Sequence, residues 1–146
     1  MVTDKKSGSP GEDNDNENEE QNKNAHPLTE ETPTILIQKT LRSGQSIRYP
    51  GNVVVMGDVN PGAEITAGGN VVVMGSLRGV VHAGATGSID ALVTAFRLQP
   101  TQLRIADQIT RAPDGGAQLP DQPEIAKIKN GRVVIERYLP GEKQKV

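Results

Sequence analysis

Short apolar runs recur along the chain at intervals of 18 residues. When the chain is written in rows of 18, Ile35-Leu36-Ile37 lies over Val53-Val54-Val55 and Val71-Val72-Val73, and the heptapeptide GNVVVMG begins at both Gly51 and Gly69. This period is too short for a helix pair or a propeller blade. It fits one turn of a β-solenoid with three strands of roughly four to five residues, each residue rising about 3.3 Å. The pattern therefore predicts an all-β fold, a triangular β-helix with about 18 residues per turn.

The repeat drifts toward the end of this region. The segment VHAGAT, which begins at Val81, matches ITAGGN, which begins at Ile65, at a shift of 16 residues. The next row, residues 87–104, keeps the apolar character of a strand but is out of register with the rows before it. We therefore expect a further turn of the solenoid with an altered spacing.

Alternation within each run separates two faces, because successive side chains of a strand point to opposite sides. The side chains expected to point inward are those of Val53, Val55, Ile65, Ala67, Val71, Val73, Val81 and Ala83. Those expected to point outward on neighbouring rungs are Leu36, Val54, Met56, Val72 and Met74. An outer apolar stripe of this extent favours a subunit interface, so we predict a homodimer that forms through it. The alternative is that the N-terminal segment or the C-terminal hairpin covers the stripe.

Composition changes along the chain and divides it into two parts. Residues 1–34 carry three basic and nine acidic side chains, whereas residues 35–146 carry 13 basic and nine acidic ones. Because residues 1–33 have almost no apolar side chains, we expect them to form a disordered acidic tail or linker before a β-helix domain at residues 34–140. Residues 112–123 should be irregular. Asn130-Gly131 predicts a hairpin between strands near residues 124–129 and 132–138.

Candidate chemistry is sparse. The chain has no cysteine and no long apolar run, so we expect no disulfide, thiolate metal site, secretory signal or membrane span, and a cytoplasmic location. His82 stands alone on an expected strand, and the glycine pairs are not followed by the Gly-Lys-Ser/Thr of a phosphate loop. Basic residues are interspersed with acids and lack aromatic neighbours, which disfavours nucleic-acid binding. We predict neither catalysis nor a cofactor.

One corner of the first rung has a distinctive sequence, LRSGQ at residues 41–45. The same rows place Leu77-Arg78-Gly79 at the equivalent corner two rungs later. Stacked rungs would bring Arg42 and Arg78 to one edge, roughly 10 Å apart. Two guanidinium groups beside Ser43 and Gln45 could bind carboxylates of a partner protein. The segment is equally compatible with an ordinary turn.

The stretch LRSGQSIRYPGNVVVMGDVNPGAEITAGGNVVVMGSLRGVVHAGATG, followed by ADQI at residues 106–109, resembles the C-terminal domain of the bacterial septum site-determining protein MinC. The resemblance implies a right-handed β-helix that dimerises and binds the ATPase MinD, which recruits it to the inner face of the cell membrane. It also implies a role in preventing FtsZ ring assembly at wrong sites. In this family the RSGQ motif lies on the MinD-binding face, which corresponds here to Arg42, Ser43, Gly44 and Gln45. Stacking extends the expected contact to Arg78 and Gly79.

The resemblance does not extend to residues 1–34, where an acidic segment replaces the folded N-terminal domain that carries the stronger FtsZ inhibition in the family. The sequence thus indicates a short form, a fragment or a truncated start. Two other β-helical classes are alternatives: bactofilin-like filament proteins and hexapeptide-repeat acyltransferases. The first lack RSGQ at such a corner, and the second need a strict six-residue repeat and a catalytic histidine. The function expected is that of a dimeric adaptor.

Overall fold

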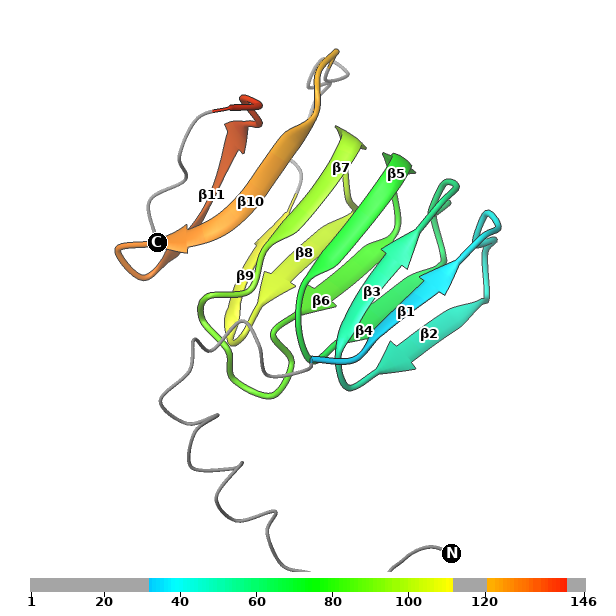
Figure 1. Cartoon of the computed structure of the whole chain (residues 1–146), viewed down its shortest axis with the longest axis horizontal. Helices are drawn as coiled ribbons and strands as arrows, with labels where there is room; N and C mark the ends of the chain where they lie inside the picture. Colours follow the sequence, from blue (N-terminus) through cyan, green and yellow to red (C-terminus); the bar gives the residue numbers. More distant parts are fainter. Residues whose placement is uncertain (1–31, 112–120, 142–146) are drawn as a thin grey trace, which may run out of the picture. The chain divides into compact units, whose positions relative to one another are not determined.

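The computed structural model describes residues 32–111 and 121–141, and within these ranges all regular secondary structure is β (Figure 1). Six strands form one sheet in the order β1-β3-β5-β7-β10-β11, and five form a second in the order β2-β4-β6-β8-β9. The strand bounds are β1 Thr34–Ile37, β2 Ser46–Tyr49, β3 Asn52–Val55, β4 Glu64–Ala67, β5 Val71–Leu77, β6 Val80–Ala83, β7 Val93–Leu98, β8 Gln102–Ile105, β9 Gln108–Arg111, β10 Glu124–Lys129 and β11 Arg132–Arg137.

The chain alternates between the two sheets and pairs each strand in parallel with the strand one turn later, which confirms the predicted β-solenoid. Val53 of β3 pairs with Val71 of β5, at the 18-residue period. Ile65 of β4 pairs with Val81 of β6, which confirms the predicted 16-residue shift. The next step is longer, because Val71 pairs with Val93 of β7, 22 residues later. The expected change of spacing in the last turn is therefore present.

The third side of the solenoid is not a sheet of short strands, and in this respect the prediction of three strands per turn was wrong. It consists of single parallel bridges that join Leu41 to Val59 and Val59 to Leu77. A turn follows Leu41 and another follows Val59, so only one residue of each rung can be extended there. All three side chains are fully buried and close the core on this side.

The interior is a column of small and branched aliphatic side chains. All eight residues that were predicted to point inward are buried, each at most 1% exposed. The largest fully buried side chains are leucines and isoleucines, including Leu103 and Ile105 of β8. Burial of such a side chain contributes roughly 1.5–3 kcal/mol, so the stacked rungs are stabilised mainly by apolar contact between them.

Asparagine side chains connect successive rungs at the corner where the chain enters the six-stranded sheet. Asn52 Nδ2 donates to Thr34 Oγ1 (3.1 Å), and Asn52 Oδ1 accepts from the Asn70 main-chain nitrogen (2.8 Å). Asn70 Oδ1 accepts in turn from the Leu92 main-chain nitrogen (2.8 Å). The second residue of the repeated heptapeptide GNVVVMG thus satisfies a main-chain donor on the following rung. This bond explains why the asparagine recurs with the apolar triplet.

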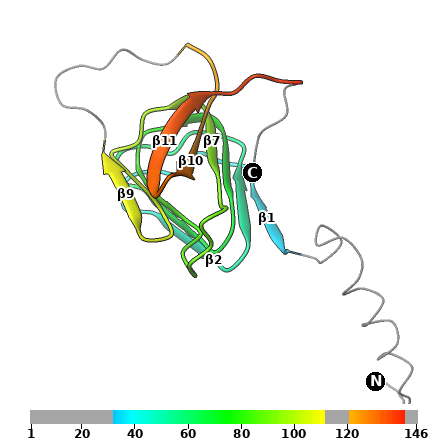
Figure 2. The ribbon, with the colours of Figure 1, turned by 90° about the vertical axis from the view of Figure 1, so that its left-hand side faces the viewer.

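Two antiparallel hairpins end the solenoid (Figure 2). β9 folds back on β8 through Ala106, which has a positive φ of 54°. β10 runs antiparallel to β7 and turns into β11 through Asn130 and Gly131, whose φ angles are 53° and 78°. These angles are those of a two-residue type I′ turn. The predicted hairpin is confirmed, with β11 ending one residue before the expected limit. The expected tail and most of the expected irregular stretch lie outside the described residues.

Candidate functional site

The residues that follow the three bridge residues, Leu41, Val59 and Leu77, form one column on the surface. Because Leu41, Val59 and Leu77 pair in register, Arg42, Asn60 and Arg78 occupy equivalent positions on successive rungs. Arg42 and Arg78 are exposed, and Asn60 is half-buried between them. We call this column, together with the turn at residues 42–45, the corner edge. The predicted placement of both arginines at equivalent corners two rungs apart is confirmed by the pairing.

The turn at residues 42–45 is closed by two hydrogen bonds between its first and last residues. The main-chain nitrogen of Gln45 donates to the Arg42 carbonyl (2.9 Å), and the main-chain nitrogen of Arg42 donates to Gln45 Oε1 (2.7 Å). Gly44 has a φ of +90°, which the third residue of a type II turn requires. Gln45 therefore fixes the shape of the motif through its side-chain oxygen. The side chains of Arg42 and Ser43 remain exposed.

The second rung repeats this turn directly beneath it. Residues 60–63 form the same closure, with the Ala63 nitrogen donating to the Asn60 carbonyl (3.0 Å) and Gly62 also at φ +90°. The Gly44 nitrogen donates to the Gly62 carbonyl (2.9 Å) and joins the two turns. A Cβ atom on Gly62 would overlap the Ser43 side chain. The exposed turn thus rests on a second turn of matching shape, which makes it a rigid platform.

The third rung has a shorter corner, because β6 begins two residues earlier relative to its neighbour. Gly79 is buried here, and a Cβ atom on it would overlap the carbonyl oxygens of Ala63 and Asn60. Thr101 holds this corner from the next rung: its hydroxyl donates to the Arg78 carbonyl (2.8 Å) and its nitrogen donates to the Gly79 carbonyl (2.9 Å). Gly79 therefore supports the corner edge from below, and Arg78 is the residue that is presented on it.

A second candidate surface is the outer side of the six-stranded sheet. The register places Leu36, Val54, Val72 and Thr94 side by side across β1, β3, β5 and β7. The exposed fractions are 53% for Leu36, 48% for Met56, 43% for Met74 and 49% for Phe96. The five residues predicted to point outward are all half-buried or exposed, as expected. We call these five and Phe96 the apolar face.

Phe96 was missed by the sequence prediction. Val73 pairs with Ala95, so the residues that follow them, Met74 and Phe96, belong to the same outer position of adjacent strands. The 22-residue step between β5 and β7 hides this equivalence when the chain is written in rows of 18. The scarcity of aromatic residues was the one available signal, because an exposed phenylalanine is conspicuous in a chain with a single one.

A groove runs along the apolar face beside the C-terminal hairpin. Its floor is the outer surface of β5 and β7, and its far wall comes from the segments that flank β10 and β11. The lining residues that matter here are Val72, Met74, Phe96, Ile125, Tyr138 and Leu139. The hairpin thus borders the apolar face through Ile125 of β10, which is itself buried, but it leaves Phe96 and Met74 exposed. The alternative in which the C-terminal hairpin covers the predicted stripe therefore applies only to its margin.

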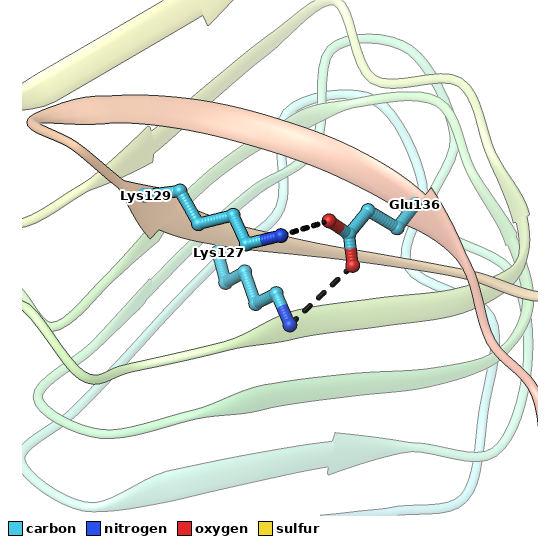
Figure 3. Close-up of polar contacts among 3 residues, drawn as sticks. All are labelled: Lys127, Lys129 and Glu136. Atoms are coloured by element: carbon cyan, nitrogen blue, oxygen red, sulfur yellow. Dashed lines mark hydrogen bonds and ion pairs between the residues drawn. The ribbon is translucent and has the colours of Figure 1, made fainter. Parts of the chain in front are cut away.

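Charged side chains of the two strands of the C-terminal hairpin meet one another (Figure 3). Glu136 of β11 pairs with two lysines of β10, through Oε1 with Lys127 (3.4 Å) and through Oε2 with Lys129 (2.8 Å). The hydrogen bond from Lys129, and after it that from Lys127, holds the pKa of Glu136 below its ordinary value. Partial burial raises the pKa of Glu124 on the neighbouring strand, and Arg137 offsets part of this effect. These pairs hold the hairpin together and do not resemble an acid–base dyad.

His82 lies half-buried on β6, and its Nε2 lies 2.9 Å from the Ala106 carbonyl oxygen. This contact links β6 to the turn between β8 and β9, so the structure gives the residue a packing partner. In the described residues no group of three or more His, Cys, Asp or Glu side chains is arranged to hold a metal ion. Across the same residues no helix is long and apolar enough to span a membrane.

Comparison with known proteins gives a consistent result. Residues 35–138 match the model of the family described as "Septum formation inhibitor MinC, C-terminal domain". The chain is 66% identical over 110 residues to a probable septum site-determining protein MinC from Heliobacterium modesticaldum, which covers 75% of this chain and 38% of that protein. It is 59% identical over 112 residues to the corresponding protein of Acetivibrio thermocellus, covering 76% of this chain and 49% of the relative. The chain thus spans about half the length of such relatives, or less.

A solved structure has the same fold. It is a chain of the "MinC:MinD cell division protein complex" from Aquifex aeolicus, with a TM-score of 0.71 and 38% sequence identity. The match covers 76% of this chain and 90% of the other.

Proposed function

Because the chain belongs to the family formed by the C-terminal domain of the septum formation inhibitor MinC, we propose that it is a dimeric adaptor that binds the ATPase MinD and helps prevent FtsZ ring assembly at wrong sites. The family is one of septum formation inhibitors and not of enzymes, as the sequence predicted. Membership also favours the adaptor over the filament and acyltransferase alternatives. MinD would recruit the protein from the cytoplasm to the inner face of the cell membrane.

The observation that supports MinD binding most directly is the corner edge. The turn at residues 42–45 presents Arg42 on a platform of stacked turns, and the bridge ladder places Arg78 in the same column. Two guanidinium groups presented from one corner of the solenoid can form bidentate bonds with carboxylates. The similar chain from Aquifex aeolicus comes from a complex with MinD, which makes MinD the natural partner for this edge.

Dimerisation is assigned to the apolar face. Leu36, Met56, Met74 and Phe96 are exposed on one side of one sheet, next to the half-buried Val54 and Val72. A contiguous exposed apolar patch of this kind is more often a site of protein–protein contact than the rest of a protein surface is. In each rung the corner edge lies between the bridge residue and the five-stranded sheet, whereas the apolar face is on the six-stranded sheet. Both contacts can therefore form at once. This separation is what an adaptor requires.

The test is co-sedimentation of the purified chain with MinD and anionic lipid vesicles, in the presence of ATP or ADP. We expect the chain to sediment with MinD and ATP and to stay in the supernatant when either is omitted. Light scattering coupled to size exclusion should give the mass of a dimer for the chain alone. A monomer at tens of micromolar would contradict the dimer, and a supernatant fraction that is the same with and without MinD would contradict MinD binding.

A further inference from the structure

Asn60 stands between the two arginines of the corner edge. Neighbouring parallel strands lie about 4.8 Å apart, so the main chains of Arg42 and Arg78 are separated by roughly 10 Å, with the rung of Asn60 between them. The sequence prediction of the partner contact included residues 42–45, Arg78 and Gly79 but not Asn60. Its place in the column follows from the bridges between Leu41, Val59 and Leu77.

The side chain of Asn60 holds the head of Arg78. Arg78 Nη2 donates to Asn60 Oδ1 at 2.8 Å, so the guanidinium of the third rung lies against the second rung, on the side of Arg42. The main chain of Arg78 is fixed independently, because the Thr101 hydroxyl donates to its carbonyl (2.8 Å) and its nitrogen donates to the Val59 carbonyl (2.8 Å). The long side chain is thus fixed at both ends.

The chemistry of an amide suits this position. A guanidinium has five N–H donors in one plane, so a single acceptor sets the orientation of that plane and leaves the other donors for a ligand. Asn60 Oδ1 accepts without a negative charge, whereas a carboxylate there would neutralise the arginine. The Asn60 main chain makes separate hydrogen bonds. Its carbonyl accepts from the Ala63 nitrogen and closes the turn, and its nitrogen donates to the Leu41 carbonyl. The side-chain bond to Arg78 is therefore separable from the fold.

We propose that Asn60 is a positioning residue of the partner-binding edge: it holds the Arg78 guanidinium toward Arg42, so that both cations meet one acidic segment of the partner. The inference rests on the proposed MinD binding and adds how the second arginine is made available. Without Asn60, Arg78 would spread over many rotamers and would have to be ordered at the moment of binding, which weakens the complex.

The experiment is a double-mutant cycle on binding to MinD with ATP, using Asn60→Ala, Arg78→Ala and the combination. Asn60→Ala should weaken binding about three- to tenfold, because the Arg78 side chain, no longer held in the free protein, must then be ordered on binding. In the Arg78→Ala background the same change should have almost no further effect, since the group that Asn60 positions is gone. Asn60→Ser is the second variant; it keeps a residue suited to the turn, but its hydroxyl is too short to replace Oδ1, so the loss should be similar.

Three outcomes would count against the inference. Additive effects of the two changes would show that Asn60 acts without Arg78, and unchanged binding of folded Asn60→Ala would show that it does not act at all. A melting temperature that falls in both Asn60 variants, with binding lost in proportion, would assign Asn60 to the turn alone. If the unsubstituted chain itself fails to bind MinD, the proposed function falls and the inference falls with it, which is a result distinct from the other three.

Discussion

Gln45 and Arg42 are joined by two hydrogen bonds, one from the Gln45 nitrogen to the Arg42 carbonyl (2.9 Å) and one from the Arg42 nitrogen to Gln45 Oε1 (2.7 Å). The last residue of the RSGQ motif therefore closes the turn with its own side chain. A glutamine in a surface motif would ordinarily be assigned to partner contact. Here its oxygen is already engaged within the chain, and its role is to keep Arg42 on a turn of fixed shape.

This relationship predicts different outcomes for two substitutions at Gln45. Gln45→Glu keeps an oxygen acceptor for the Arg42 nitrogen, whereas Gln45→Ala removes it, and a net hydrogen bond contributes about 0.5–1.5 kcal/mol. We expect Gln45→Ala to lower the melting temperature by a few degrees, since about 1 kcal/mol corresponds to roughly 4–8 °C in a domain of this size. Gln45→Glu should melt close to the unsubstituted chain. Equal melting temperatures for the two variants, measured by circular dichroism, would exclude this role.

Arg42 should contribute to binding and not to stability. Its side chain is exposed, and the structure gives it no place in the core. Truncation of one partner of a desolvated charge pair costs about 2–5 kcal/mol, so Arg42→Ala should weaken MinD binding by at least about thirtyfold. Arg132→Ala, an exposed arginine on the C-terminal hairpin, is the matched control and should bind normally. Undiminished co-sedimentation of folded Arg42→Ala would remove the corner edge from the site.

Gly44, in contrast to Arg42, should contribute to stability. A Cβ atom on Gly44 would meet no atom within 4 Å, so space does not forbid a side chain, but its φ of +90° does disfavour one. Gly44→Ala should therefore lose roughly 1 kcal/mol of stability through backbone strain. Gly44 is therefore needed for the backbone conformation of the turn, whether or not the motif also binds a partner. Only the binding of Arg42→Ala separates the two interpretations of RSGQ, and a Gly44→Ala variant as stable as the parent would contradict the turn geometry.

Much of this fold could be predicted from the sequence, because the 18-residue period of the apolar runs and the alternation of inward and outward side chains each apply to many residues at once. The inner and outer positions of Val53, Val54 and Val55 follow from alternation, and the 16-residue shift at Ile65 follows from the match between ITAGGN and VHAGAT. The 22-residue step to Val93 could not be predicted in length, because the loop before β7 carries no periodic constraint. The length of that loop also hides the equivalence of Phe96 and Met74 when the chain is written in rows of 18.

The candidate site was predictable to the same degree. Equal spacing placed Arg42 and Arg78 in one column, because a parallel ladder repeats the position of every residue. The bond from Arg78 to Asn60 depends on which rotamer a long side chain adopts, and a repeat pattern contains no information on that choice. The hydrogen bond by which the Gln45 side chain closes the turn likewise depends on a rotamer that the repeat does not determine. The sequence therefore located the residues, and the three-dimensional contacts distinguished those that are presented from those that support them.

The lysine pair around Glu136 predicts a dependence of stability on acid pH. The folded state lowers the pKa of this carboxyl, so its ion pairs stabilise the protein above the pKa of the unfolded chain, and this stabilisation is lost as pH falls through the lower folded-state pKa. Glu136→Gln should melt below the parent at neutral pH, partly because Lys127 is only 11% exposed and loses its carboxylate. The two melting curves should converge in acid, where Glu136 is itself neutral. A difference that persists unchanged at low pH would show that the loss is steric.

Adjacent residues of β3 should give opposite results when each is replaced by aspartate. Val55 is fully buried, so Val55→Asp places an uncompensated carboxylate in the core, at a cost of several kcal/mol, and should unfold the domain. Val54 lies on the apolar face, so Val54→Asp should leave the fold intact and convert the dimer to a monomer. Circular dichroism measures the first effect and light scattering the second. If Val54→Asp unfolds the chain while Val55→Asp is tolerated, the assignment of the two faces is inverted.

Phe96 provides the sharpest test of the interface, because it entered the apolar face from the structure and not from the repeat. Phe96 is 49% exposed next to Met74, and it lines the groove beside the C-terminal hairpin. Buried aromatic side chains dominate many interfaces, and their truncation often costs 2 kcal/mol or more, so Phe96→Ala should raise the dimer dissociation constant by at least about thirtyfold. Ile89→Ala is a suitable control, since Ile89 is more exposed, at 61%, and lies in the loop before β7. Sedimentation equilibrium over a range of concentrations measures both variants. A Phe96→Ala chain that dimerises as tightly as the Ile89→Ala control would confine the interface to β1, β3 and β5.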